Sequence, residues 1–406
     1  MKITKYGKEI WHFEGKIIIY GGGEYGLQFY ETIYSQVTPE NLYVCDRNNM
    51  ICEKFSQYIY LDDLQKFIEK YQEVCLIIAI KNEKIVKYIY DRMIYLGIVE
   101  DNIYRYIPET NEEWRGRKLK EGFFNGEKNI HIKSGDETKN LIENMIRGEK
   151  PFFYARWGSI EGKIVYRNKI GILTEKDKQE GCNNAGIFPI EDELIKGYVK
   201  ITEEAARKID ILCMGFWVPQ LEELYKRYSY QAIPVSAIIM PLEISVLSFA
   251  KSLKGMKVLV IHPFSTLIQK QYEKRELLFS KLGDVMILPE MELITYSAVQ
   301  SMGGSTEYAS WIEALEKMER DILGIDFDVA LIGCGAYGMP LGAFIKEKMR
   351  KKAIHVGGAL QLLFGIKGRR WDERGYETWL YNEHWVYPTE DLRPLNYKSV
   401  ENGCYW

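Results

Sequence analysis

The spacing Gly-x-Gly-x-x-Gly occurs twice in this chain, each time between a short β-branched run and a helical pattern. The first copy is GGGEYG, from Gly21 to Gly26, and it follows KIIIY. The second is GCGAYG, from Gly333 to Gly338, and it follows DVALI. Glycines let a strand turn tightly into a helix, and they let a ligand approach the backbone closely. Because a strand that leads directly into a helix opens a βαβ unit, both copies predict parallel sheets.

The alternation of strand and helix patterns continues on both sides of the two turns. In the N-terminal part we expect strands at 16–20, 42–46, 74–80 and 103–106. Later in the chain we expect strands at 152–156, 211–216, 257–262, 285–289, 328–333 and 353–358. The run VCLIIAI is apolar throughout, as expected of a parallel strand that is buried on both faces. The predicted fold class is α/β, with two Rossmann-like domains, each a mostly parallel doubly wound sheet.

A polar and glycine-containing stretch separates the two halves of this pattern. Residues 111–129 are rich in charged side chains and are the predicted linker. We expect an N-terminal Rossmann-like domain over 1–110 and a larger domain over 130–406. The chain has 406 residues, which is enough for two domains that each bury a core.

The composition of the chain limits which partners and which cellular location we expect. The formal net charge of −3 offers no basic field for a nucleic-acid backbone, so we expect no nucleic-acid partner. The seven cysteines form no CxxC pair, and several lie in apolar runs, which favours reduced, buried thiols. The N-terminus shows no apolar signal region, and the longest apolar run is broken by Pro234, Pro241 and Glu243. We therefore expect no transmembrane segment, and a cytoplasmic location, free or peripheral at the inner face of the membrane.

The first glycine turn has the features of a nucleotide site. Asp46 ends the next predicted strand, which is where a carboxylate would hold a ribose hydroxyl. Gly21, Gly23, Gly26 and Asp46 are therefore candidates for a second nucleotide site. Glu24 lies in the turn and would repel a pyrophosphate, and the alternative is that the glycines only form a tight turn.

The second glycine turn lacks such an acid, because the next predicted strand ends in His355-Val-Gly-Gly358. A basic cluster follows instead, in the sequence FGIKGRRW. Arginine and lysine side chains close to a glycine-rich helix start suit a diphosphate. The alternative is a solvated charge run. The residues that we assign to a phosphate-binding site here are Gly333, Gly335, Ala336, Tyr337, Gly338, His355, Gly357, Lys367, Arg369 and Arg370.

Two further predicted strands end in side chains that can take part in chemistry. The strand 257–262 ends in His262, and Ser265 follows at a predicted helix start. The strand 152–156 ends in Arg156. It is followed by Gly158, Ser159 and Glu161. In a doubly wound sheet, ligands bind at the carboxyl ends of the strands, so these residues are candidates for ligand contact.

The region 130–406 resembles the GT-D-type glycosyltransferases. The resemblance rests on HPFSTLIQKQYEKR, LPEMELITYSAVQS, EALEKM, DFDVALIGCGAYGMPLGAFIK and AIHVGGALQLLFGIKGRRWD. It implies a single Rossmann-like domain that binds a nucleotide sugar such as a UDP-hexose. Residues 1–110 lie outside it.

The resemblance also implies a motif of the form R-x-G-D-G-E, whose carboxylates are associated with Mn²⁺ or Mg²⁺ and the sugar nucleotide. Arg156, Gly158 and Glu161 match, but Ser159 stands where the first acid would be, and a hydroxyl is a poorer ligand for a hard cation. Three alternatives follow. Glu161 holds the metal with waters, or the lysine and arginines of the basic cluster neutralise the diphosphate without metal, or the chain has lost transfer activity.

The sequence therefore predicts a glycosyltransferase that moves a hexose from a nucleoside diphosphate sugar, with UDP as the expected nucleotide, to a hydroxyl of a glycan or glycoprotein. Arg156 and Glu161 are the predicted catalytic residues. A second hypothesis is an NAD(P)- or nucleotide-dependent sugar-modifying enzyme that uses the N-terminal turn. A third is a nucleotide-sugar-binding protein without activity.

Overall fold

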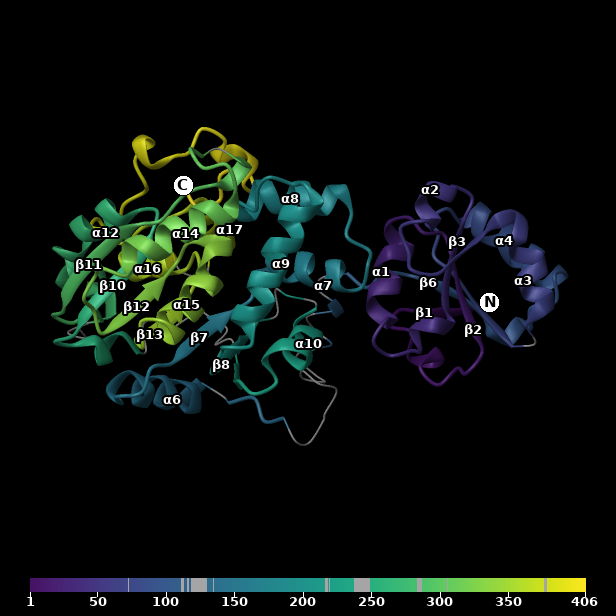
Figure 1. The fold of residues 1–406 in the computed structure, drawn as a ribbon, viewed down its shortest axis with the longest axis horizontal. Helices are drawn as coiled ribbons and strands as arrows, with labels where there is room; N and C mark the ends of the chain where they lie inside the picture. Colours follow the sequence, from purple (N-terminus) through teal and green to yellow (C-terminus); the bar gives the residue numbers. More distant parts are fainter. Residues whose placement is uncertain are drawn as a thin grey trace. The chain divides into compact units, whose positions relative to one another are not determined.

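The computed structural model describes residues 1–71, 73–110, 113–114, 117, 130–133, 135–215, 218, 220–236, 249–282, 287–304, 306–375 and 378–406 (Figure 1). The chain divides into two compact units. One comprises Met1–Asn125 and Arg167–Leu173, and the other Gly126–Tyr166 and Thr174–Trp406. Most of the predicted linker 111–129 lies outside the described residues. Each unit contains one wholly parallel sheet, which confirms the predicted α/β class with two Rossmann-like domains.

The first unit has a six-stranded sheet in the order β1-β6-β5-β2-β3-β4. Its strands are β1 (Lys2–Thr4), β2 (Lys16–Tyr20), β3 (Leu42–Asp46), β4 (Tyr58–Tyr60), β5 (Val74–Ile78) and β6 (Ile103–Tyr106). Its α-helices are α1 (Glu24–Ile33), α2 (Asn49–Cys52), α3 (Leu64–Lys70) and α4 (Glu83–Tyr95). The sequence predicted the four inner strands and missed β1 and β4. These are short strands at the two edges of the sheet, and their few residues give little periodic signal.

The second unit has a seven-stranded sheet in the order β11-β10-β12-β13-β7-β8-β9. Its strands are β7 (Phe153–Arg156), β8 (Ile211–Met214), β9 (Ile233–Ser236), β10 (Lys257–His262), β11 (Glu292–Ser297), β12 (Val329–Ile332) and β13 (Lys352–His355). The helices that precede β10 are α6 (Gly135–Arg147), α7 (Ser159–Lys169), α8 (Glu175–Ala185), α9 (Asp192–Ala206) and α10 (Leu221–Leu224). Those that follow it are α12 (Ser265–Tyr272), α13 (Arg275–Leu278), α14 (Trp311–Ile322), α15 (Gly338–Glu347), α16 (Leu360–Leu363) and α17 (Arg369–Arg374).

One predicted strand of this sheet was wrong. The run 285–289 was expected to be a strand, but residues 287–289 are not in a strand, and residues 285–286 lie outside the described part of the chain. The outer strand is β11, which among the described strands pairs with β10 alone. Because β11 is an edge strand, its side chains are exposed or half-buried and lack the apolar run of an inner strand.

The inner strands of the second unit carry its core. Every residue of β12 is buried, as are the last five residues of β10. The core extends beyond the sheet to Val400, Cys404 and Trp406, which are buried against it. All seven cysteines are buried and none forms a disulfide, as predicted. Within the described residues, no helix is both long enough and apolar enough to cross a membrane.

Helix α15 packs very closely on the sheet, because glycines replace side chains on its inner face. A Cβ atom on Gly342 would overlap the ring of Phe153 in β7, and one on Gly338 would overlap the imidazole of His355 in β13. Close packing between a helix and a strand is one established use of the last glycine in such a turn. The second fingerprint therefore has a packing function that does not depend on any ligand.

We predict that Gly342→Ala lowers the free energy of unfolding by about 1–3 kcal/mol, because the added methyl group must displace an aromatic ring in a dense core. Urea denaturation followed by tryptophan fluorescence measures this loss. Gly324→Ala is the matched control, since a Cβ atom there meets nothing within 4 Å. Equal stability of the two variants would contradict the packing function.

Candidate functional site

The predicted site residues of the second unit come from four strands that are neighbours in the sheet. Strands β10, β12, β13 and β7 follow one another in that order, and all are parallel. Their carboxyl ends therefore meet at one edge, where they place His262, Gly333, His355 and Arg156. From β10 the chain continues to β11 on one side, whereas from β12 it continues to β13 on the other. The boundary between β10 and β12 is thus a topological switch point, where ligands of such sheets bind.

His262 stands at this switch point as a neutral hydrogen-bond donor. Its side chain is 3% exposed, and the backbone N–H of Phe264 donates to Nδ1 over 3.0 Å. With Nδ1 acting as the acceptor, the ring proton is on Nε2. Burial lowers the pKa of His262 to about 3, so the imidazole remains uncharged at neutral pH. Gly333 lies directly beside it, because a Cβ atom there would be 2.8 Å from Cδ2 of His262.

His355 is a second buried histidine at the same edge. Burial, and then the charge of Arg156, lower the pKa of His355 to about 3. Its Nδ1 atom is buried and has no hydrogen-bond partner among the residues that the structure describes. The ring lies against the start of α15, where Gly338 makes room for it. His355 therefore fixes the position of this helix on the sheet.

Arg156 lies close to the loop after β13, and Glu161 lies over the turn that follows β7. The guanidinium group of Arg156 packs on Gly357, where a Cβ atom would be 2.5 Å from Nε. Gly357 has a φ of 79°, which also favours glycine at this position. The carboxyl group of Glu161 turns back over Gly158, which leaves no room for a side chain there. Ser159 is exposed at the start of α7.

The pKa of Glu161 responds to two of the three arginines that the sequence singled out, Arg156 and Arg370. Burial raises the pKa of Glu161, and a backbone hydrogen bond and the guanidinium groups of Arg156 and Arg370 oppose this rise. Arg156 ends strand β7 and packs on Gly357. Arg370 lies in α17 and donates to Tyr405, whose ring packs on Gly358, so only the tertiary structure brings the two arginines to one loop. Two guanidinium groups at one loop, both of which favour the charged form of Glu161, form an anion-binding arrangement.

The other two residues of the basic cluster, Lys367 and Arg369, have different partners from Arg370. The ammonium group of Lys367 lies 5.2 Å from the ring centres of both Tyr381 and Tyr387. Arg369 pairs along its own helix with Glu373 at 2.6 Å. The three basic residues therefore do not act as one patch. Arg370 is the member that acts on Glu161.

The glycine turn itself is held by side chains that the sequence did not single out. Gly335 has a φ of 58°, and the following Tyr337 is buried. The hydroxyl groups of Tyr337 and Ser301 are hydrogen-bonded over 2.7 Å, and the Tyr337 ring stacks on Trp311 at 5.2 Å. Tyr337 is therefore anchored inside the unit. Ala336 is buried beside it, and Ser265 is buried at the start of α12.

The side chains around Glu161 can be compared with the ligands that a divalent metal ion requires. Glu161 supplies one carboxyl group with a raised pKa, Ser159 supplies a hydroxyl, and two guanidinium groups act on the same carboxyl. A hard divalent cation takes several oxygen ligands, mostly carboxylate, carbonyl and water oxygens. The residues in this arrangement do not fit Mn²⁺ or Mg²⁺ well. Among the described residues, no group of three His, Cys, Asp or Glu side chains is placed to hold a metal ion.

The N-terminal glycine turn lies at the switch point of its own sheet, between β2 and β5. Gly26 packs so closely on Gly21 that a Cβ atom would overlap its carbonyl oxygen, while Gly23 has open space around it. The carboxylate of Asp46 accepts the backbone N–H of Gly22 over 2.8 Å and that of Asn48 over 2.9 Å. Both of its oxygens are thus engaged within the protein. Asp46 holds the turn in place, and this function needs no ribose.

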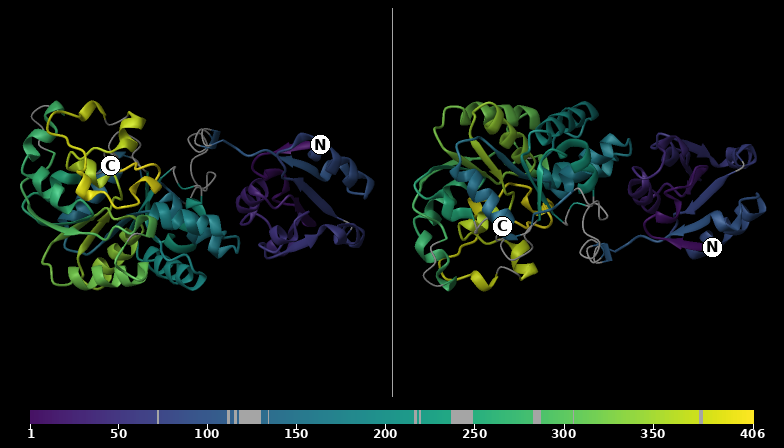
Figure 2. Two further views of the ribbon diagram at one scale, coloured as in Figure 1. Left: turned by 90° about the horizontal axis from the view of Figure 1, so that it is seen from above. Right: turned by 90° about the horizontal axis from the view of Figure 1, so that it is seen from below.

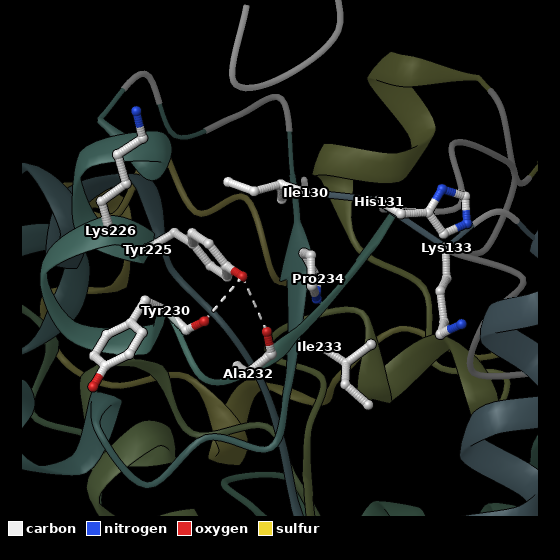
Figure 3. A pocket seen from close by; sticks show the side chains of 9 residues that line it. All are labelled: Ile130, His131, Lys133, Tyr225, Lys226, Tyr230, Ala232, Ile233 and Pro234. Atoms are coloured by element: carbon white, nitrogen blue, oxygen red, sulfur yellow. Dashed lines mark hydrogen bonds between the residues drawn. The ribbon is translucent and has the colours of Figure 1, made fainter. Parts of the chain in front are cut away.

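A groove at the other end of the large sheet was not predicted from the sequence. It has a volume of about 700 Å³ and lies at the start of β9, near the amino edge. Figure 3 shows Tyr225 within it, donating to the carbonyl oxygens of Tyr230 and Ala232 over 3.3 and 3.2 Å. None of the predicted site residues lines this groove. Because ligands of such sheets bind at the carboxyl edge, we place the candidate site there.

Neither a family model, a curated protein nor a solved structure matches this chain. The resemblance to GT-D-type glycosyltransferases therefore rests on the sequence motifs alone.

We predict that His262 makes the protein less stable in mild acid. The unfolded histidine takes up a proton below about pH 6.5, whereas the folded one does so only near pH 3. The stabilisation is therefore present above pH 6.5 and is lost as the pH falls toward 3. Between pH 7 and pH 5 the wild type should lose about 2 kcal/mol more of its free energy of unfolding than His262→Asn. Urea denaturation at both pH values measures this difference, and equal losses would contradict it.

We predict that Asp46→Ala destabilises the first unit by about 1–3 kcal/mol, because two backbone N–H groups lose a charged acceptor. Asp62→Ala, at an exposed position, is the control and should change stability by less than about 0.5 kcal/mol. Thermal unfolding of both variants measures the effect. A stable Asp46→Ala protein that had lost binding of NAD(P) or a nucleotide would instead support a ligand function for Asp46.

Proposed function

We propose that the second unit binds a nucleoside diphosphate sugar at the carboxyl edge of its sheet and transfers the hexose to a hydroxyl group of a glycan or glycoprotein. The observation that carries the proposal is that two arginines that are far apart in the sequence meet at the loop after β13. Arg156 packs on Gly357. Arg370 donates to the hydroxyl of Tyr405, whose ring packs on Gly358. Arg156 is the last residue of β7, in the sheet whose carboxyl edge includes the switch point. The sequence motifs shared with GT-D-type glycosyltransferases support the same conclusion.

The reaction needs stabilisation of a leaving diphosphate. When the acceptor oxygen bonds to the anomeric carbon, the bond from that carbon to the diphosphate breaks, and negative charge develops on the leaving oxygen. Arg156 and Arg370 are cations that can hold this charge with paired N–H groups. The neutral imidazole of His262 supplies one further N–H donor at the switch point. In this proposal, these side chains serve the diphosphate without a metal ion.

The reaction also needs a group that accepts the proton of the acceptor hydroxyl. Glu161 is the carboxyl group that lies with these arginines, and burial raises its pKa. A carboxylate with a raised pKa is a stronger base than an ordinary one, so it removes a hydroxyl proton more readily. We therefore assign proton acceptance, or contact with the sugar, to Glu161.

We predict that UDP binds to the wild-type protein with a Kd below 1 mM, and that Mn²⁺ changes this affinity little. Because hydrogen bonds to charged groups contribute about 1.5–3 kcal/mol, Arg156→Ala should weaken binding about tenfold to a hundredfold. Arg320→Ala is the control, since Arg320 lies on the exposed side of α14 and pairs with Glu316. Isothermal titration with several nucleoside diphosphates, with and without Mn²⁺, measures these affinities.

Binding weaker than millimolar for every nucleoside diphosphate would overturn the proposal. If a nucleotide does bind, hydrolysis of the nucleotide sugar in the absence of an acceptor is measured next. An enzyme should hydrolyse it slowly, whereas a protein that only binds the nucleotide sugar should not. Hydrolysis that is lost in Glu161→Gln supports transfer chemistry. Tight binding with no hydrolysis and no transfer would favour a binding protein without activity.

A further inference from the structure

We propose that Glu401 occupies the anion position on Arg370, and that a phosphate group of the ligand displaces it. The inference rests on the proposed function, because it concerns regulation of the same site. Glu401 belongs to residues 400–406, a segment that the sequence did not connect with the site. Its contacts place a carboxylate where the proposed function needs a phosphate.

The contact between Glu401 and Arg370 is a direct ion pair. Nη2 of Arg370 donates to Oε2 of Glu401 over 2.8 Å, and Nη1 donates to the hydroxyl of Tyr405 over 2.9 Å. The Arg370 side chain is 19% exposed and that of Glu401 is 50% exposed. The cation is therefore largely enclosed by the protein, whereas the carboxylate is half in water and becomes fully hydrated when it leaves.

The segment that carries Glu401 lies over the carboxyl edge of the sheet. The ring of Tyr405 packs on Gly358, which lies three positions after His355, the last residue of β13. The ring of Trp406 lies 6.2 Å from that of Phe264, just after β10. Figure 1 and Figure 2 show this last part of the chain, in yellow, against the second unit. The ion pair thus stands at the edge that we assign to the ligand.

The backbone around Glu401 is held in an uncommon conformation. Glu401, Asn402 and Gly403 have φ values of 44°, 58° and 81°, so all three are left-handed. This conformation is unfavourable for residues that carry a Cβ atom. Val400, Cys404 and Trp406 are buried on either side and anchor the segment. The turn that presents Glu401 is therefore strained between fixed ends, and release of the ion pair needs only a local movement.

A neighbouring ion pair provides the comparison. Arg369 pairs with Glu373 within α17, and both side chains are largely exposed. Glu373 is not among the residues assigned to the site, although Arg369 also donates to the carbonyl oxygen of Asn402 over 2.9 Å. Replacing either glutamate by glutamine removes one negative charge next to one arginine, so the two substitutions are matched in chemistry and differ in place.

The test is isothermal titration of the full chain with UDP and with inorganic pyrophosphate. Glu401→Gln should bind both ligands about twofold to fivefold more tightly than the wild type, because the internal competitor has lost its charge. Glu373→Gln should bind as the wild type does. Hydrogen exchange of residues 400–403 should become faster when UDP binds, because the ion pair that holds the turn is broken.

The outcomes separate this inference from the proposed function. If neither the wild type nor Glu401→Gln binds UDP or pyrophosphate, the proposed function fails, and the inference fails with it. If the wild type binds but Glu401→Gln binds equally or more weakly, only the inference is overturned. A similar gain in Glu373→Gln would also overturn it, since the effect would then come from net charge. Circular dichroism checks that each variant is folded.

Discussion

The second unit depends on the pairing of β13 with both β12 and β7. Strand β13 is the last strand in the sequence, yet it lies between these two strands in the sheet. Its backbone hydrogen bonds therefore join the first strand of the unit to strands that come much later. Because all of these strands are parallel, this pairing brings Arg156, Gly333 and His355 to one edge. Without it, the residues that carry the proposed chemistry would not lie together.

Close packing around β13 explains why glycines recur in this part of the chain. Gly338 makes room for the His355 ring, Gly357 for the Arg156 guanidinium, and Gly358 for the Tyr405 ring. In each case a large polar side chain packs directly on backbone. The same packing removes water from the histidines, which lowers their pKa and keeps them neutral. One structural feature therefore sets both the shape and the charge of the site.

The strands could be predicted from the sequence where they are buried on both faces. The runs 16–20 and 257–262 are apolar and β-branched, and each was predicted with the bounds that the structure shows. Strand β11 was missed because it is an edge strand with half-buried side chains, so its pattern resembles that of a loop. Helix α4 begins after Asn82, whose side chain accepts the backbone N–H groups of Lys84 and Ile85, as asparagine commonly does at a helix start.

The sequence alone was sufficient to predict the parallel α/β class, the two glycine turns and the strands that carry Arg156, His262 and His355. These properties depend on residue type and local periodicity, which are present in any short window of the chain. Only the tertiary structure decided that Asp46 holds its own turn, that Lys367 lies between two tyrosines, and that Glu401 pairs with Arg370. Those contacts join residues through the packing of separate elements, and a linear pattern carries no information about which side chain reaches which partner.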